Sequence, residues 1–130
     1  MVRFRVEKLI RDRLPAIMRA QGLAVFDRRL DDAAFVDALK AKLLEEAAEA
    51  QAAVSGEELA GELADLSEVI LALAQAHGLT ADDIEARRLA KRAERGGFED
   101  RVYNAAVEAE DGLPAADYYL ARPGQYPRIA

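Results

Sequence analysis

The chain has 130 residues, and its 18 basic and 24 acidic residues give a formal net charge of −6. With 52% hydrophobic and 32% charged residues, it has the composition of one small globular domain. The acidic charge argues against a nucleic-acid partner, because such partners are attracted by a positive field. No cysteine is present, so disulfides, thiolate metal sites and cysteine nucleophiles are excluded. Without a membrane-length apolar run or an apolar signal core, the expected location is the cytoplasm, with no membrane partner.

Alanine is abundant and aromatic residues make up only 6% of the chain. This composition favours helices that approach closely and form thin cores. A short chain with a thin core is marginally stable, and association with further copies would add burial. We therefore predict an all-α protein, an antiparallel helical bundle completed in a homodimer or higher homo-oligomer.

The first segment alternates apolar and charged residues, with Val2, Phe4 and Val6 as the apolar positions. Asp12 stands where a helix cap is expected, just before a proline that suits a first helical turn. The pattern predicts an extended arm followed by a short helix that ends near Gln21.

Two long amphipathic segments follow. The first begins at Asp31 or Asp32, either of which suits an N-cap, and runs up to Ser55-Gly56. The second runs from about Glu57 to His77 and stops at a glycine. Apolar residues recur every three or four positions, which predicts two helices joined as a hairpin. These residues are Val36, Leu39, Leu43, Ala47, Ala50 and Val54 in the first segment, and Leu59, Leu63, Leu66, Ile70 and Leu73 in the second.

A third helix is predicted from Thr80, which can cap it, to the stop at Gly96-Gly97. Apart from two apolar residues, this segment displays mostly basic side chains, so we expect an exposed basic face. The pattern weakens after Phe98. A short helix is expected at about residues 102–107, and no structure is assigned to the tail at residues 112–130.

Every charged residue from Glu45 to Glu68 is acidic. At about 100° per residue, Glu62 falls within the apolar stripe of its helix and Glu46 falls at the edge of its own stripe. A carboxylate that faces a core is costly unless it is protonated, paired or bound to a metal. Acidic residues three positions later on each helix, Glu49 and Asp65, lie one turn away. The two pairs predict four carboxylates that converge across the hairpin.

Oxygen ligands of this kind select hard cations, Mg²⁺ or alternatively Mn²⁺. The absence of a Glu-x-x-His pair argues against a di-iron centre, and His77 is interpreted as a helix-end residue. Lys42 is a candidate counterion of the acids. Because Mg²⁺ keeps positions open for phosphate oxygens, a carboxylate cluster together with a basic helix predicts a polyphosphate substrate.

Glu46-x-x-Glu49 followed, after twelve residues, by Glu62-x-x-Asp65 resembles the signature of the MazG-like all-α nucleoside triphosphate pyrophosphatases. Further segments resemble its single-domain branch, the phosphoribosyl-ATP pyrophosphohydrolase-like house-cleaning proteins. These segments are Lys8–Pro15, Leu30–Asp32, Lys42–Glu49, Glu58–Asp65 and Lys91–Phe98. We accordingly expect a catalytic domain at residues 1–101 and an extension at residues 102–130.

The resemblance implies hydrolysis between the α- and β-phosphates of a nucleoside triphosphate, which gives the monophosphate and pyrophosphate. Carried over by position, the Mg²⁺ ligands are Glu46, Glu49, Glu62 and Asp65. The general base is expected to be Glu45 or Glu49, although Glu45 points away from the apolar stripe and can equally be a solvated surface acid.

Lys91 and Arg95 lie four positions apart on one helical face and are expected to bind phosphates, the alternative being an ordinary solvated face. Lys8, Arg11 and Arg13 are further phosphate-binding candidates.

Two other functions remain open. One is phosphoribosyl-ATP hydrolysis in histidine biosynthesis, which these motifs do not separate from house-cleaning. The other is a non-catalytic acidic helical module that binds a basic partner.

Overall fold

The computed structural model describes residues 1–130, and its regular structure is entirely helical, as predicted. The chain divides into two compact units, Met1–Glu94 and Arg95–Ala130. No helix combines the length and the apolar character that crossing a membrane requires.

The chain begins with an extended segment and then forms the short helix α1 (Leu14–Ala20), as predicted. The capping role predicted for Asp12 is wrong, because the N-cap residue is Arg13 and no side chain caps this helix. A backbone turn, with Leu14 N donating to Arg11 O at 3.0 Å, leads into the helix instead. Asp12 lies inside this turn, and Pro15 occupies the first helical turn, where no amide donor is needed.

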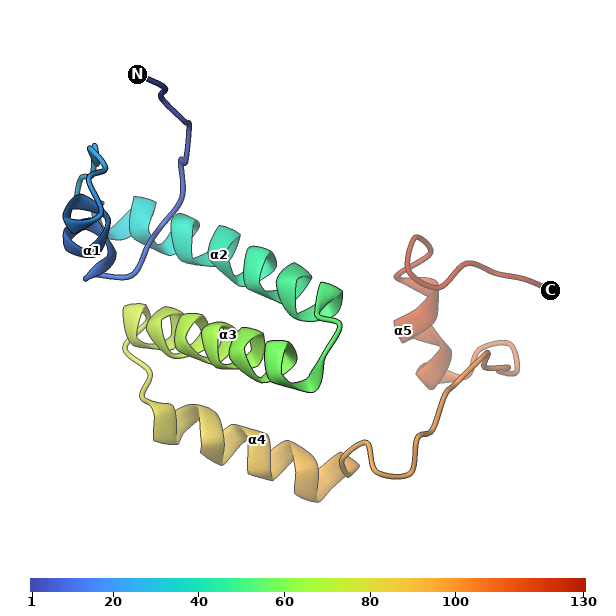
Figure 1. Cartoon of the computed structure of the whole chain (residues 1–130). Helices are drawn as coiled ribbons and strands as arrows, with labels where there is room; N and C mark the ends of the chain where they lie inside the picture. Colours follow the sequence, from blue (N-terminus) through green and yellow to red (C-terminus); the bar gives the residue numbers. More distant parts are fainter. The chain divides into compact units, whose positions relative to one another are not determined.

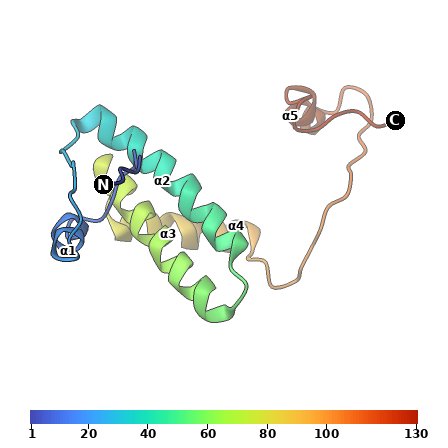
Figure 2. The same cartoon turned by 45° about the horizontal axis from the view of Figure 1, so that its top comes forward.

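The helices α2 (Asp32–Ala52) and α3 (Gly56–Ala76) form the predicted antiparallel hairpin and pack side by side in both views (Figures 1 and 2). Side chains cap both N-termini: Asp31 accepts from Ala34 N at 2.9 Å, and Ser55 accepts from Glu58 N at 3.1 Å. Gly78 ends α3 with a φ of +74°, a conformation that glycine adopts without a Cβ clash.

The apolar core of the hairpin is small. Leu39, Val69 and Ala74 are its only buried apolar residues. Leu59 and Leu63, which belong to the predicted apolar stripe of α3, stay 39% and 47% exposed. One partner helix covers only part of the stripe, because the stripe of an amphipathic helix is wider than a single contact seam. The hairpin therefore presents uncovered apolar surface.

The basic helix α4 (Ala81–Arg95) starts at a reciprocal cap, as predicted. Asp83 N donates to Thr80 Oγ1 at 3.1 Å, and Thr80 N donates to Asp83 Oδ2 at 2.8 Å. The helix buries none of its residues and packs against neither α2 nor α3. The helix α4 therefore adds no residue to the core of the hairpin.

The second unit contains the short 3₁₀ helix η1 (Pro114–Ala116) and the short helix α5 (Asp117–Leu120), in a tail to which the sequence analysis assigned no structure. The short helix predicted at residues 102–107 is wrong, since this segment has no regular structure. Val102 and Tyr103 are 87% and 92% exposed, and such residues have low helix propensity unless one face is packed. Tyr118, Tyr119 and Tyr126 stack edge-on or tilted, with ring centroids 5.0–5.7 Å apart.

Candidate functional site

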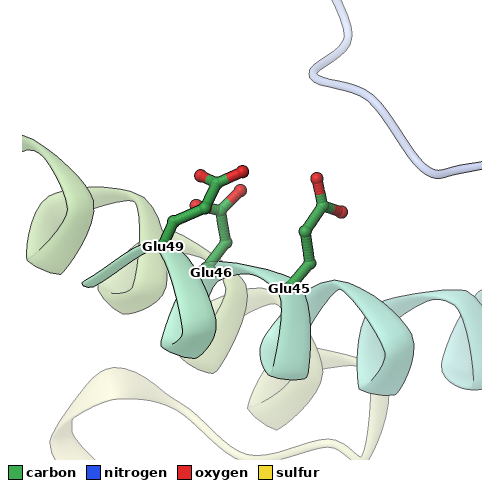
Figure 3. A group of neighbouring side chains, drawn as sticks. All are labelled: Glu45, Glu46 and Glu49. Atoms are coloured by element: carbon green, nitrogen blue, oxygen red, sulfur yellow. The ribbon is translucent and has the colours of Figure 1, made fainter. Parts of the chain in front are cut away.

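Two overlapping carboxylate groups lie on the α2–α3 hairpin. The first group is Glu45, Glu46 and Glu49, which project from one side of α2 (Figure 3). The second group is Glu46, Glu62 and Asp65, which joins α2 to α3. Within each group, one carboxylate oxygen of every member lies within 4.8 Å of the others, and the burial of the members differs. Glu46 belongs to both groups, so the hairpin brings together all four predicted metal ligands around one side chain.

Glu46 is 6% exposed and is the only buried charged residue. One of its oxygens, Oε1, lies 3.3 Å from Lys42 Nζ, which confirms Lys42 as a counterion. The other, Oε2, is buried without a hydrogen-bond partner, and so is Oε2 of Glu62. Burial raises the pKa of Glu46, since a charged carboxylate loses its hydration there. Two buried oxygens without partners, facing a shared set of acids, fit a hard divalent cation.

Glu45 is held by two lysines. Its Oε1 lies 2.9 Å from Lys8 Nζ, and its Oε2 lies 3.4 Å from Lys42 Nζ. The hydrogen bond from Lys8 is the main cause that lowers the pKa of Glu45. To accept a proton from water as a general base, Glu45 would have to give up these ion pairs.

Glu49 and Asp65, the outer members of the two groups, have different surroundings. Glu49 is exposed and forms no ion pair, so its carboxylate is accessible to water. Asp65 is half-buried, and its Oδ1 accepts from Arg11 Nη2 at 2.7 Å. Its proximity to buried Glu46 distinguishes Glu49 from an ordinary surface acid.

The predicted phosphate-binding residues separate into two sets. Lys8 and Arg11 contact the carboxylate groups, whereas Arg13 is the exposed N-cap of α1. Lys91 is exposed on α4, and Arg95 ends that helix and begins the second unit. The structure thus brings two of these five cations to the acids.

The predicted helix-end position of His77 is confirmed. His77 is the C-cap of α3, and its Nδ1 lies 3.0 Å from Leu73 O. It belongs to neither carboxylate group.

Sequence reasoning missed the contacts of Lys8 and Arg11 with the acids. The two contacts join residues 37 and 54 positions apart, and a helical pattern carries no information on pairs so distant. The only available signal is that the basic residues of the first segment outnumber the acids near them.

The comparisons with known proteins add one match. The family model described as phosphoribosyl-ATP pyrophosphohydrolase matches residues 7–92, which include both carboxylate groups, Lys8, Arg11 and Lys91. No curated protein and no solved structure matches the chain. The matched segment covers most of the chain, and its carboxylate groups could hold the divalent metal on which pyrophosphohydrolases of this family generally depend. The chain is thus a pyrophosphohydrolase, acting on phosphoric anhydrides, that belongs to the phosphoribosyl-ATP pyrophosphohydrolase family within the MazG-like all-α superfamily.

Proposed function

We propose that the protein is a Mg²⁺-dependent nucleoside triphosphate pyrophosphohydrolase that cleaves the α–β anhydride and removes non-standard nucleotides. The observation that carries the proposal is buried Glu46, which has an unpartnered oxygen and belongs to two carboxylate groups. A structural acid in that position would be expected to have both oxygens paired. A non-catalytic acidic module gives no reason to bury a carboxylate, because an acid that attracts a basic partner acts from the surface.

In this proposal, the Mg²⁺ ligands are Glu46, Glu49, Glu62 and Asp65, with Mn²⁺ as an alternative ion. The bound cation would neutralise phosphate charge and lower the pKa of a water molecule. Of the two base candidates, we favour an oxygen of Glu49, since its carboxylate is exposed and lacks an ion pair. Glu45, held by Lys8 and Lys42, instead positions the lysines beside the cluster.

The triphosphate requires cations of its own, because the metal ligands are all anionic. Lys91 and Arg95 supply two from α4, and the first segment supplies Lys8, Arg11 and Arg13. Ammonium and guanidinium groups form charge-assisted hydrogen bonds with phosphate oxygens. The exposure of Lys91 supports this assignment, since a phosphate-binding lysine must be accessible to substrate.

The protein is also proposed to act as a homodimer or higher homo-oligomer in the cytoplasm. Half-exposed apolar residues on α3 and α4 support this assembly, in particular Leu63 at 47% and Leu89 at 50% exposure. Scattered exposed apolar residues are ordinary, but uncovered stripes on a hairpin with three buried apolar residues are a surface that a further copy could cover. Light scattering at micromolar concentration is expected to give at least twice the 14.2 kDa chain mass. A species of 14.2 kDa alone would contradict this assembly.

The experiment that tests the function is a panel of nucleoside triphosphates, standard and oxidised or deaminated, incubated with the protein and Mg²⁺. Pyrophosphate and orthophosphate are scored separately, and we expect pyrophosphate with a preference for a non-standard base. Phosphoribosyl-ATP belongs in the panel as the second candidate, because it is named in the description of the matching family. A strong preference for it would replace house-cleaning by histidine biosynthesis. Nucleotide binding without turnover, or no Mg²⁺-dependent binding at all, would leave the interaction module as the better account.

A further inference from the structure

The N-terminal arm, defined as residues 1–13, is attached to the acidic cluster at two points. Lys8 Nζ lies 2.9 Å from Glu45 Oε1 on α2, and Arg11 Nη2 lies 2.7 Å from Asp65 Oδ1 on α3. Glu45 belongs to the first carboxylate group and Asp65 to the second, so the arm occupies one member of each. A divalent cation bound in either group would compete with the arm for carboxylate charge.

The two ion pairs that attach the arm can be broken. The side chains of Lys8 and Arg11 are 48% and 57% exposed, and ion pairs of such exposure hold weakly. The residue before Lys8, Glu7, adopts a φ of +45°, in the left-handed region that a residue with a side chain disfavours. Residues 7–9 and α2 together line a cavity of about 240 Å³, so the packing between the arm and α2 is incomplete there.

We propose that the arm is a mobile phosphate clamp, in which Lys8 and Arg11 exchange the carboxylates of the cluster for the phosphates of the substrate when a divalent cation binds. The inference rests on the proposed function and adds a coupling between its two ligands. A cation bound by the proposed ligands takes Asp65 from Arg11, and its positive charge beside Glu45 repels the ammonium group of Lys8, so both groups are freed. Both then meet phosphate oxygens, whose charge and geometry they match. The arm is open with the cation alone and closed when the triphosphate is added.

The test uses Lys8→Ala and Arg11→Ala in the full chain, with two calorimetric titrations. In the first, Mn²⁺ is titrated without nucleotide, and each variant is expected to bind it about two- to fivefold more tightly, since an exposed competing ion pair is gone. In the second, α,β-methylene ATP is titrated at saturating Mn²⁺, and each variant is expected to bind it about tenfold more weakly. The matched control is Arg5→Ala, which removes the same charge from the same arm at an exposed residue outside both ion pairs.

Tryptic digestion of the wild-type protein supplies a second readout. Mn²⁺ is expected to accelerate cleavage within the arm, and added α,β-methylene ATP is expected to slow it again. Cleavage after Arg101, in the second unit, serves as the internal reference. Opposite effects of the two ligands are specific to a clamp, because a merely structural arm would be stabilised by both.

Three results would overturn the clamp. Mn²⁺ affinities equal to that of Arg5→Ala would show that the arm does not compete with the cation. Tighter Mn²⁺ binding with unchanged analogue binding would reduce Lys8 and Arg11 to counterions. Weaker binding of both ligands would make their role structural. In each case the wild-type protein still binds Mn²⁺ and the proposed function survives, whereas a wild-type protein that binds no divalent cation would overturn both.

Discussion

The α2–α3 hairpin and the helix α4 use charge in opposite ways. The hairpin turns acidic side chains toward a packed seam and buries Glu46 there, at 6% exposure. The helix α4 buries nothing, and its terminal cap and an exposed pair between Arg88 and Glu85, at 2.6 Å, support it locally. A buried carboxylate costs stability unless something compensates it, whereas solvated cations cost little. The comparison therefore teaches that the buried acid of the hairpin needs compensation, from Lys42, a proton or a cation, whereas the exposed cations of α4 are stable in solvent alone.

The largest expected effect tests the hairpin. We predict that Glu46→Gln, Glu62→Gln and Asp65→Asn each lower kcat/KM by about a hundredfold or more, because each amide keeps the shape and loses the ligand charge. Differential scanning fluorimetry should show that Mg²⁺ raises the Tm of the wild-type protein and not that of the variants.

The matched control for the hairpin is Glu68→Gln, which removes an exposed acid of α3 outside both carboxylate groups. It should retain both turnover and the Mg²⁺-dependent rise in Tm. If Glu46→Gln turned over normally, or if Mg²⁺ left the wild-type Tm unchanged, the burial of Glu46 would need another explanation.

The next effect tests whether α4 is more than a solvated face. Lys91→Ala and Arg95→Ala are predicted to lower kcat/KM roughly ten- to a hundredfold, as expected for the loss of one charge-assisted hydrogen bond each. The Mg²⁺-dependent rise in Tm should remain, because these side chains are not metal ligands. Lys40→Ala, which removes an exposed charge from α2, controls for the change in net charge. Unchanged kinetics in both variants would limit the phosphate contacts to the arm.

The smallest effect concerns the N-cap of α4. Removal of the Thr80 hydroxyl by Thr80→Ala is predicted to cost about 1 kcal/mol of helix stability, the usual value of an N-cap. Since α4 does not pack on α2 or α3, far-UV circular dichroism should show a small loss of helix with the hairpin transition retained. An equal loss across the whole first unit would mean that α4 and the hairpin unfold as one.

The same cap has a pH dependence. Hydrogen bonds from the backbone and side chain of Thr80 lower the pKa of Asp83. A carboxyl whose folded-state pKa is lowered contributes stability above its unfolded-state pKa and loses it as the pH falls through the folded-state value. The difference in helix stability between the wild-type protein and Asp83→Ala, which removes the carboxylate itself, should therefore shrink in acid. A difference that grew as the pH fell would contradict this cap.

Local signals in the sequence predicted the helices well and the contacts between segments poorly. Asp31, Ser55 and Thr80 begin helices through hydrogen bonds to residues three positions later, so a short window contains the whole signal. The cap predicted at Asp12 by the same criterion is wrong, because the backbone turn before α1 already uses the amide of Leu14. The helix predicted at residues 102–107 does not form, because no face of this segment is packed.

The carboxylate groups were predicted, but the relative burial of their members was not. Glu62 was placed within the apolar stripe and Glu46 at its edge, yet Glu46 is the buried one and Glu62 is half-buried. A helical wheel treats each helix alone, and burial also depends on how the partner helix lies across it. The contacts of Lys8 and Arg11 depend still more on tertiary structure, since they join distant segments.

The tyrosine cluster of the second unit has a consequence for measurement. The chain has no tryptophan, and all four of its tyrosines lie between Tyr103 and Tyr126, inside that unit. Intrinsic ultraviolet fluorescence and near-ultraviolet dichroism in the tyrosine bands therefore report on the tail, while the far-ultraviolet helix signal comes mainly from α2, α3 and α4. Non-coincident transitions in the two signals would show two units that unfold independently. One unlabelled sample thus yields separate melting curves for the first unit and for the tail.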